Sequence, residues 1–113
     1  MANTLYHNPR CSKSRQTLKL LEENGIKFEI KEYLKEGLSG KEIKDLASAL
    51  KMDVLEFTRK KESVFKELAL KDKSEKELIK AMAENPILLE RPIFVKGKKA
   101  ALGRPPEQVL ELA

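Results

Sequence analysis

Apolar residues recur along the chain with spacings that predict its secondary structure. Residues 3–7 (NTLYH) form a short extended run typical of a strand. Residues 12–24 place Leu18 and Leu21 on one face, as expected for a helix. Apolar and charged residues then alternate over residues 26–33, which indicates a half-buried second strand, parallel to the first because a helix lies between them. We therefore expect the chain to begin with a β-α-β unit.

The middle of the chain has the pattern of several helices. Ser39 and Glu42 form a capping-box pattern, and the apolar residues that follow repeat with helical spacing: Ile43, Leu46, Ala47 and Leu50. Residues 53–68 predict short helical pieces. Ser74 and Glu77 repeat the capping signal, so we expect a further helix after them.

Strand patterns return near the C-terminus. Two apolar runs, residues 92–95 and 100–102, flank Lys96–Lys99, which predicts a tight hairpin connection. Pro105-Pro106 then favours the start of a final helix.

The element order is β-α-β, helices, β-β-α. This order is typical of an α/β protein with a thioredoxin-like fold and a helical insertion. We expect a single domain over residues 1–113. Its thioredoxin-like halves would be residues 1–34 and 86–113, and the helical insert would be residues 39–85.

Composition suits one compact domain. The 113-residue chain is 41% hydrophobic, enough to fold without disulfides or a structural metal. Its single cysteine can form neither an internal disulfide nor a multi-thiolate metal site, which favours a reducing compartment. No stretch approaches the roughly 20 apolar residues of a membrane span, and the opening residues lack the pattern of a secretory leader. We expect a soluble, cytoplasmic protein without a membrane partner.

The formal net charge is +5 and the pI is about 9.3. Lysines alternate with acidic residues, for example over residues 31–45, which is typical of a solvated, ion-paired surface. Because aromatic-basic interleaving and recognition-helix motifs are lacking, we expect no nucleic-acid partner. The positive field still favours small anions.

One short stretch, residues 6–18 (YHNPRCSKSRQTL), contains the only cysteine, the only histidine and two of the five arginines. Cys11 stands between the predicted strand and helix. Backbone N–H groups at a helix N-terminus, together with neighbouring Arg10, stabilise a thiolate there. The polar neighbours of Cys11 argue against the alternative, an inert cysteine in the core.

Arginine is scarce: only five of the 23 basic residues are arginines. Besides Arg10 and Arg15 these are Arg59, Arg91 and Arg104, and the last two directly precede proline, which holds their backbone extended. A planar guanidinium suits a tetrahedral oxyanion. A surface ion pair explains each arginine equally well from its position alone.

The stretch HNPRCSKSR resembles the HNPxCxxSR signature of the glutaredoxin-dependent arsenate reductase (ArsC) family. Three later segments are similar to further blocks of that family, in the same order: Arg59-Lys60, residues 85–93 (NPILLERPI) and residues 103–112 (GRPPEQVLEL). The resemblance covers nearly the whole chain. The family also contains uncharacterised ArsC-like proteins and Spx-type transcriptional regulators, so the resemblance is less specific to arsenate.

The resemblance implies a role for each candidate site residue. Cys11 corresponds to the catalytic nucleophile, and the substrate-binding arginines correspond to Arg59, Arg91 and Arg104. Arg91-Pro92 corresponds to a cis-proline beside the active cysteine. Three further residues are candidates for an auxiliary role at this site: His7, Ser14 and Arg15.

The auxiliary residues have alternative roles. His7 could help to ionise the thiol or orient a hydrogen bond, although a histidine at a strand end is also commonly structural. Ser14 could donate to the anion or cap the first turn of the helix. Arg15 could assist the site or simply face solvent.

The implied function is reduction of arsenate to arsenite through a Cys11 thiol–arsenate adduct. Because the chain has no second cysteine, glutathione as co-substrate and glutaredoxin would supply the next thiols. No metal and no bound cofactor are implied, since one histidine and one cysteine do not form a metal site.

Two alternatives remain open. One is an ArsC-like thiol oxidoreductase that acts on another glutathione-linked substrate. The other is a non-catalytic, Spx-like regulatory protein that binds a protein partner. Spx-type members usually carry Cys-x-x-Cys, whereas this chain has Ser14 at the second position, so an internal redox switch is excluded.

Overall fold

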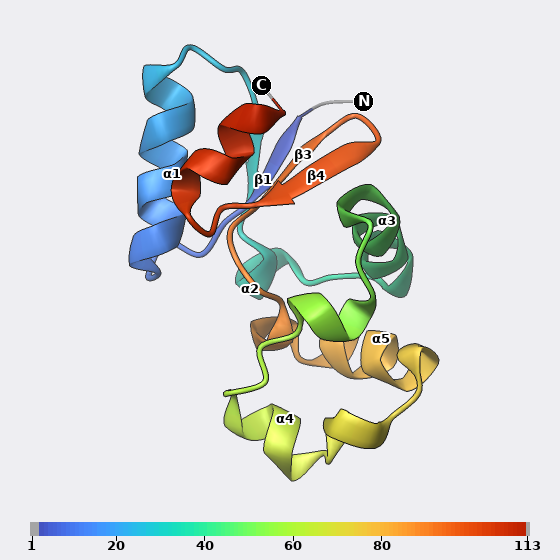
Figure 1. Ribbon diagram of the computed structural model, residues 1–113. Coiled ribbons are helices and arrows are strands. Elements are labelled where there is room, and N and C mark those ends of the chain that lie inside the picture. Colours follow the sequence, from blue (N-terminus) through green and yellow to red (C-terminus); the bar gives the residue numbers. More distant parts are fainter. Residues whose placement is uncertain (1–2, 113) are drawn as a thin grey trace. The chain divides into compact units, whose positions relative to one another are not determined.

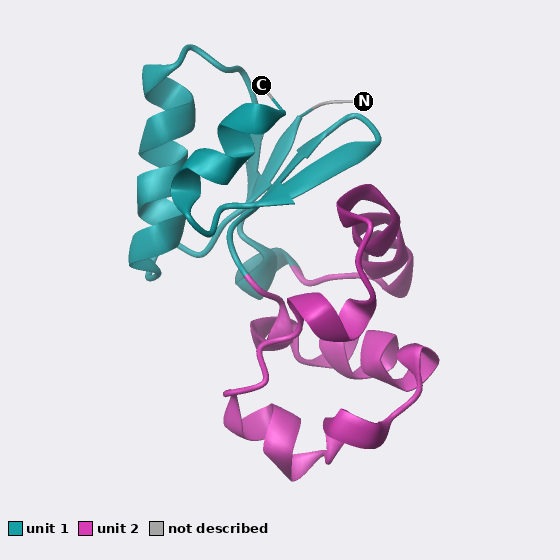
Figure 2. Cartoon of the chain, viewed as in Figure 1, with its two compact units in different colours: residues 1–36, 91–113 teal, residues 37–90 magenta. Residues whose placement is uncertain are grey.

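The computed structural model describes residues 3–112. The chain divides into two compact units, coloured separately in Figure 2. Unit 1 comprises Met1–Glu36 and Arg91–Ala113, and unit 2 comprises Gly37–Glu90. The expected insert, residues 39–85, falls inside unit 2.

Unit 1 is built on a four-stranded mixed sheet with the strand order β2-β1-β3-β4 (Figure 1). The parallel pair in it joins β1 (Thr4–Tyr6) to β2 (Glu29–Lys31). On its other side β1 pairs antiparallel with β3 (Ile93–Lys96), which forms a hairpin with β4 (Lys99–Leu102). The predicted α/β class, with a β-α-β opening and a C-terminal hairpin, is confirmed.

Helix α1 (Ser12–Glu23) and the 3₁₀ helix η4 (Pro106–Glu111) pack beside each other (Figure 1). Their buried side chains join those of the sheet in one apolar core, formed by Leu5, Leu21, Phe94 and Val109. All four are fully buried. Burial of each such side chain contributes on the order of 1.5–3 kcal/mol relative to leaving it exposed, so this core fixes α1 and its N-terminus against β1.

Local sequence signals account for the ends of these elements. Helix α1 ends at Glu23, and Gly25 continues with φ +68°, a conformation that glycine adopts at little cost. Gly97 has φ +61° in the turn between β3 and β4. Strand β2 is shorter than the alternation over residues 26–33 predicts, since it pairs only with the three residues of β1. Ile26 and Phe28, which precede it, pack against the core. A short helix, α2 (Tyr33–Glu36), follows β2.

Unit 2 is helical. Its elements in chain order are α3 (Gly40–Leu50), η1 (Val54–Phe57), α4 (Ser63–Glu67), η2 (Leu70–Asp72), α5 (Glu75–Glu84) and η3 (Pro86–Leu88). The predicted capping box of α3 is present: Glu42 N–H donates to Ser39 Oγ, and Ser39 N–H donates to Glu42 Oε1. At the start of α5, Glu77 N–H donates to Ser74 Oγ, as the repeated signal predicts.

Backbone pairing joins the segment that follows η1 to the C-terminal end of unit 2. Thr58 and Leu89 form an isolated antiparallel bridge. Beside it Arg59 N–H donates to the Leu88 carbonyl at 2.7 Å, and Glu90 N–H donates to the Phe57 carbonyl at 2.9 Å. These bonds place Arg59 next to Glu90 within unit 2. Over residues 3–112, every helix is too short or too polar to span a membrane.

Candidate active site

Asn8 shapes the loop that connects β1 to α1. Its backbone carbonyl accepts the N–H of Cys11 at 3.0 Å, and its side-chain Oδ1 accepts the N–H of Arg10 at 3.0 Å. Asparagine favours such turns because its side chain satisfies the backbone two residues on. The loop places Cys11 in extended conformation (φ −94°, ψ 124°) as the N-cap residue of α1. The thiol is therefore carried at the N-terminus of a 12-residue helix.

The surroundings of Cys11 lower the pKa of its thiol. The largest single effect opposes this, because partial burial raises the pKa. It is outweighed by hydrogen bonds from the backbone N–H groups of Ser14 and Lys13, and by the Arg91 guanidinium, which acts through its charge and as a hydrogen-bond donor. Cys11 is half-buried and free of any disulfide. The site thus favours an accessible thiolate, the reactive form of cysteine.

His7 and Ser14 form a buried pair behind the loop. Nδ1 of His7 lies 2.7 Å from Oγ of Ser14, and Ser14 Oγ also accepts the N–H of Asn8 at 3.0 Å. We assign His7 Nδ1 as an acceptor, because the single proton of the Ser14 hydroxyl then has a partner. The Ser14 hydroxyl is thus held by the loop, and it caps none of the N–H groups of its own helix.

Burial favours the neutral form of His7. It lowers the pKa of the imidazole and is the largest influence on it. The carboxylate of Glu32 acts in the opposite direction, and the charge of Arg15 lowers the pKa further. A neutral ring fits the assignment of Nδ1 as an acceptor from Ser14.

Arg91 and Arg104 lie together in unit 1. The Nε–H of Arg104 donates to the backbone carbonyl of Arg91 at 2.9 Å. Both arginines precede prolines in cis peptide bonds, Arg91-Pro92 and Arg104-Pro105. The sequence resemblance implies the first of these, whereas the second was not anticipated.

The guanidinium of Arg91 has donor groups without an acceptor. Its Nε and Nη1 atoms are buried and have no hydrogen-bond partner within residues 3–112. Buried polar groups are nearly always hydrogen-bonded, and leaving one unpaired costs about 1–3 kcal/mol, more for a charged group. Since the same guanidinium acts on Cys11, these N–H groups are suited to an anion bound beside the thiol.

Arg59 belongs to unit 2, where two carboxylates hold its guanidinium. Its Nη1 lies 2.7 Å from Glu62 Oε2, and its Nε lies 3.7 Å from Glu90 Oε1. Convergence of Arg59 with the other two arginines stays a prediction.

Comparison with known proteins places the chain in a family. The model of the ArsC family matches residues 6–112. The chain belongs to the ArsC family. Its relatives include the uncharacterized protein YfgD of Escherichia coli K12, which is 52% identical over 96% of this chain and 93% of its own length. An arsenate reductase of Haemophilus influenzae is 47% identical and is covered over 99% of both chains.

Solved structures give the same family. The arsenate reductase from Vibrio cholerae is 47% identical and superposes with a TM-score of 0.95, covering 100% of this chain and 98% of that one. The resemblance found in the sequence and the predicted thioredoxin-like fold are therefore confirmed.

In this ArsC-family chain, Gly103 allows the end of β4 to pack closely against Thr17 of α1 and against Pro92. A Cβ added at Gly103 would lie 2.6 Å from Thr17 Oγ1 and 2.7 Å from the Pro92 ring, closer than real Cβ atoms approach other atoms. Gly103 N–H also donates to the Pro92 carbonyl at 2.9 Å. Only glycine lets the strand before Arg104 pass so close to α1 and Pro92.

Arg15 and Arg10 are exposed residues of the loop and first helical turn. Arg15 Nη1 donates to the Pro9 carbonyl at 2.9 Å, so this side chain folds back on the loop. Among the described residues of this ArsC-family protein, no group of three or more histidine, cysteine, aspartate or glutamate side chains could hold a metal ion.

Three residues that shape the site carry no predicted role: Asn8, Thr17 and Gly103. Asn8 had a readable signal, because Asn-Pro favours a turn. Thr17 is fully buried, and its hydroxyl donates to the Lys13 carbonyl at 2.9 Å. Nothing local distinguishes Thr17 from a surface threonine, since its burial depends on Gly103 from a distant part of the chain.

Proposed function

We propose that this protein is an arsenate reductase in which Cys11 is the nucleophile. The observation that carries the proposal is the Arg91 guanidinium, which lowers the pKa of Cys11 and has two buried nitrogens without a partner among residues 3–112. An arsenate oxyanion beside Cys11 would satisfy these donors and present arsenic to the thiolate. Relatives of 40–47% identity that are named arsenate reductases support this choice of substrate.

The first step joins Cys11 to arsenic. The thiolate sulfur forms an S–As bond, one As–O bond breaks, and the departing oxygen takes up protons and leaves as water. Arg91, with Arg104 beside it, would stabilise the oxyanion. We propose that Arg59 is the third arginine of this site, which requires its guanidinium to exchange Glu62 or Glu90 for the substrate.

External thiols then supply two electrons. Glutathione replaces a second oxygen on arsenic, again releasing water. The thiolate of glutaredoxin attacks the glutathione sulfur, and the electron pair of the S–As bond passes to arsenic, which is reduced from As(V) to As(III). Glutathione and glutaredoxin leave as a mixed disulfide, and hydrolysis of the remaining Cys11–As bond releases arsenite. The requirement for external thiols follows from the single cysteine.

A coupled assay tests this function. Arsenate-dependent oxidation of glutathione should require the protein, glutathione and glutaredoxin together, and should be lost in Cys11→Ser, which keeps the size of the side chain but not its acidity. Turnover by Cys11→Ser would refute the adduct. If the wild-type protein does not reduce arsenate but consumes a glutathionylated substrate, the alternative thiol oxidoreductase is favoured. Inactivity with both substrates would favour a non-catalytic protein.

A further inference from the structure

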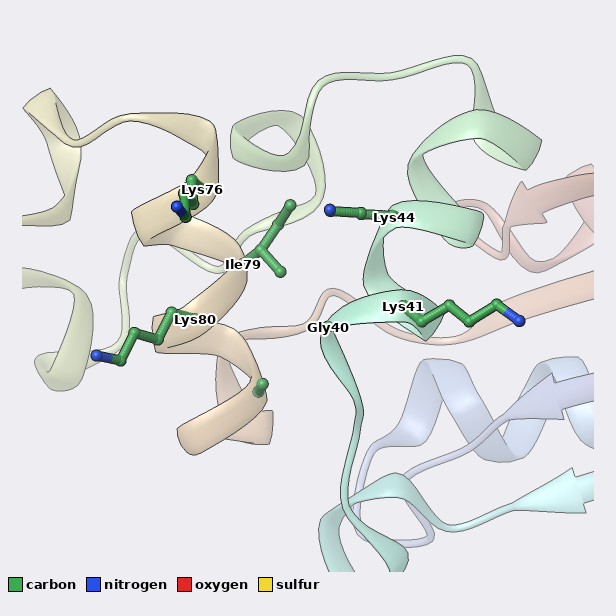
Figure 3. A pocket seen from close by; sticks show the side chains of 7 residues that line it. Gly40, Lys41, Lys44, Lys76, Ile79 and Lys80 are labelled. Atoms are coloured by element: carbon green, nitrogen blue, oxygen red, sulfur yellow. The ribbon is translucent and has the colours of Figure 1, made fainter.

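Unit 2 contains a groove between α3 and α5 that lies outside the Cys11 site. It has a volume of about 490 Å³, within the range of ligand-binding clefts. Both helices contribute to its lining, which consists of Gly40, Lys41, Lys44, Lys76, Ile79, Lys80 and Ala83. Figure 3 shows Ile79 of α5 and Lys44 of α3 pointing toward each other across it.

The floor of the groove is formed by Gly40, Ile79 and Ala83, and Gly40 leaves it open because it has no side chain. A Cβ at Gly40 would lie 3.4 Å from Cγ2 of Ile79, so the two helices already touch here. Ile79 is 9% exposed, and its exposed part together with Ala83 faces the hollow. An apolar side chain of a partner could therefore rest on the Gly40–Ile79 contact without displacing anything.

Four lysines surround this floor, and none of them pairs with another residue of the described chain. Lys41 and Lys80 extend outward on opposite sides of the groove in Figure 3. By contrast Lys73, three residues before Lys76, is paired with Glu77 at 3.9 Å. Unit 2 has eleven basic and eleven acidic residues, so the gathering of lysines here is a local separation of charge. The rim is complementary to carboxylates.

We propose that the groove binds an acidic segment of a protein partner. An aliphatic or aromatic side chain of that segment would rest on Ile79 and Ala83, and carboxylates on either side of it would face the lysines. This surface is separate from arsenate chemistry and does not depend on it.

The lining favours a protein segment over other polyanions. It contains no aromatic side chain on which a nucleic-acid base could stack. Its floor is recessed between two helices, which a flat lipid surface would not reach. Unlike a nucleic acid or a flat lipid surface, a protein segment offers both an apolar side chain for the floor and several carboxylates for the rim.

The test uses the full-length protein and a synthetic helical peptide that has a central leucine flanked by glutamates three and four residues away. We expect amide chemical-shift changes confined to α3 and α5 on titration. Lys44→Glu/Lys76→Glu should weaken binding about tenfold or more, whereas Lys66→Glu/Lys71→Glu, which makes the same charge change on exposed residues of unit 2 outside the groove, should not. Gly40→Leu, which fills the floor, should also weaken it.

Four results would overturn the proposal that the groove binds an acidic protein segment. Shift changes outside the groove, or equal weakening by both double variants, would overturn the proposal. So would binding of the same peptide with glutamine in place of glutamate at equal affinity. Duplex DNA or anionic vesicles that displace the peptide at comparable charge concentration would also overturn it, because the groove would then be a general polyanion surface. Amide spectra of the free variants establish that each is folded.

Discussion

The Nε–H of Arg104 donates a 2.9 Å hydrogen bond to the backbone carbonyl of Arg91. The bond joins the residue just beyond β4 to the residue shortly before β3, so two arginines thirteen positions apart lie at the same end of the hairpin. Arg91 in turn lowers the pKa of the Cys11 thiol at the start of α1. The hairpin and the β1–α1 loop thus contribute one arginine pair and one thiol to a single site.

Replacement of Arg104 by lysine should affect catalysis more than folding. Lysine keeps the charge but cannot present two parallel N–H groups to an oxyanion. We expect arsenate turnover to fall about 10- to 100-fold, the effect of losing one charge-assisted hydrogen bond. Because the side chain is exposed, the free energy of unfolding should change by about 0.5 kcal/mol or less. Lys98→Gln, an exposed charge change in the same hairpin, is the control and should leave both unchanged. Equal losses of activity and stability in Arg104→Lys would contradict a binding role.

The thiol of Cys11 should ionise below the ordinary cysteine pKa of about 8.5. The rate of alkylation by iodoacetamide follows the thiolate fraction, so its midpoint against pH reports the pKa. We expect a midpoint below the ordinary value in the wild type and a shift upward in Arg91→Gln, which removes the guanidinium charge that stabilises the thiolate. A midpoint at or above the value of a free cysteine would refute the activated thiol.

His7 should make folding stability depend on pH. The pKa of His7 in the folded protein is below its ordinary value of about 6.5, so the unfolded chain takes up a proton first as the pH falls. Stability should therefore decrease as the pH drops below about 6.5 and level off below the folded pKa. Since His7 is the only histidine, NMR titration of its ring gives the folded pKa directly.

The variant His7→Asn provides the control for this pH dependence. Its amide oxygen can accept from Ser14 in the place of Nδ1 but does not titrate. Denaturant midpoints measured at pH 7.5 and 5.5 should differ less in the variant than in the wild type. An equal difference in both proteins would mean that other groups cause the pH dependence.

Gly103→Ala should destabilise the fold and disturb the site together. The new methyl group would lie 2.6 Å from Thr17 Oγ1 and 2.7 Å from the Pro92 ring, so the chain before Arg104 must move. Overpacking of this kind costs about 1–3 kcal/mol. The matched control is Gly40→Ala, which adds a methyl group 3.4 Å from Ile79 in a helix and should be neutral or slightly stabilising. Thermal unfolding of both variants checks the difference. An unchanged unfolding temperature in Gly103→Ala would contradict the prediction, because the surrounding atoms would then move aside at little cost.

The sequence predicts well those structural features that depend on residues close together in the chain. The capping box of Ser39 and Glu42 and the end of α1 near Gly25 involve residues within one turn, so their patterns are readable. The element order followed from such local signals, and the fold class followed from the order.

The parts that escaped prediction depend on distant contacts. Ser14 was expected to face the anion or cap its helix, but its hydroxyl is held by His7 and Asn8 in the preceding loop. The close approach of Gly103 to Thr17 joins segments far apart in sequence. Arg59 is paired with Glu62 and Glu90, and the backbone pairing of Thr58 with Leu89 brings Glu90 beside it. The spacing of residues along the chain does not predict these contacts.

The central claim is that Arg91 holds an oxyanion beside the Cys11 thiolate, and protection of Cys11 from alkylation tests it most directly. Iodoacetamide is uncharged, so bound anion affects its reaction by covering the sulfur or by binding covalently to it. With chloride added to equal ionic strength as the control, arsenate should slow alkylation saturably in the wild type and much less in Arg91→Gln. An alkylation rate that arsenate leaves unchanged in the wild type, or slows equally in both proteins, would contradict the claim.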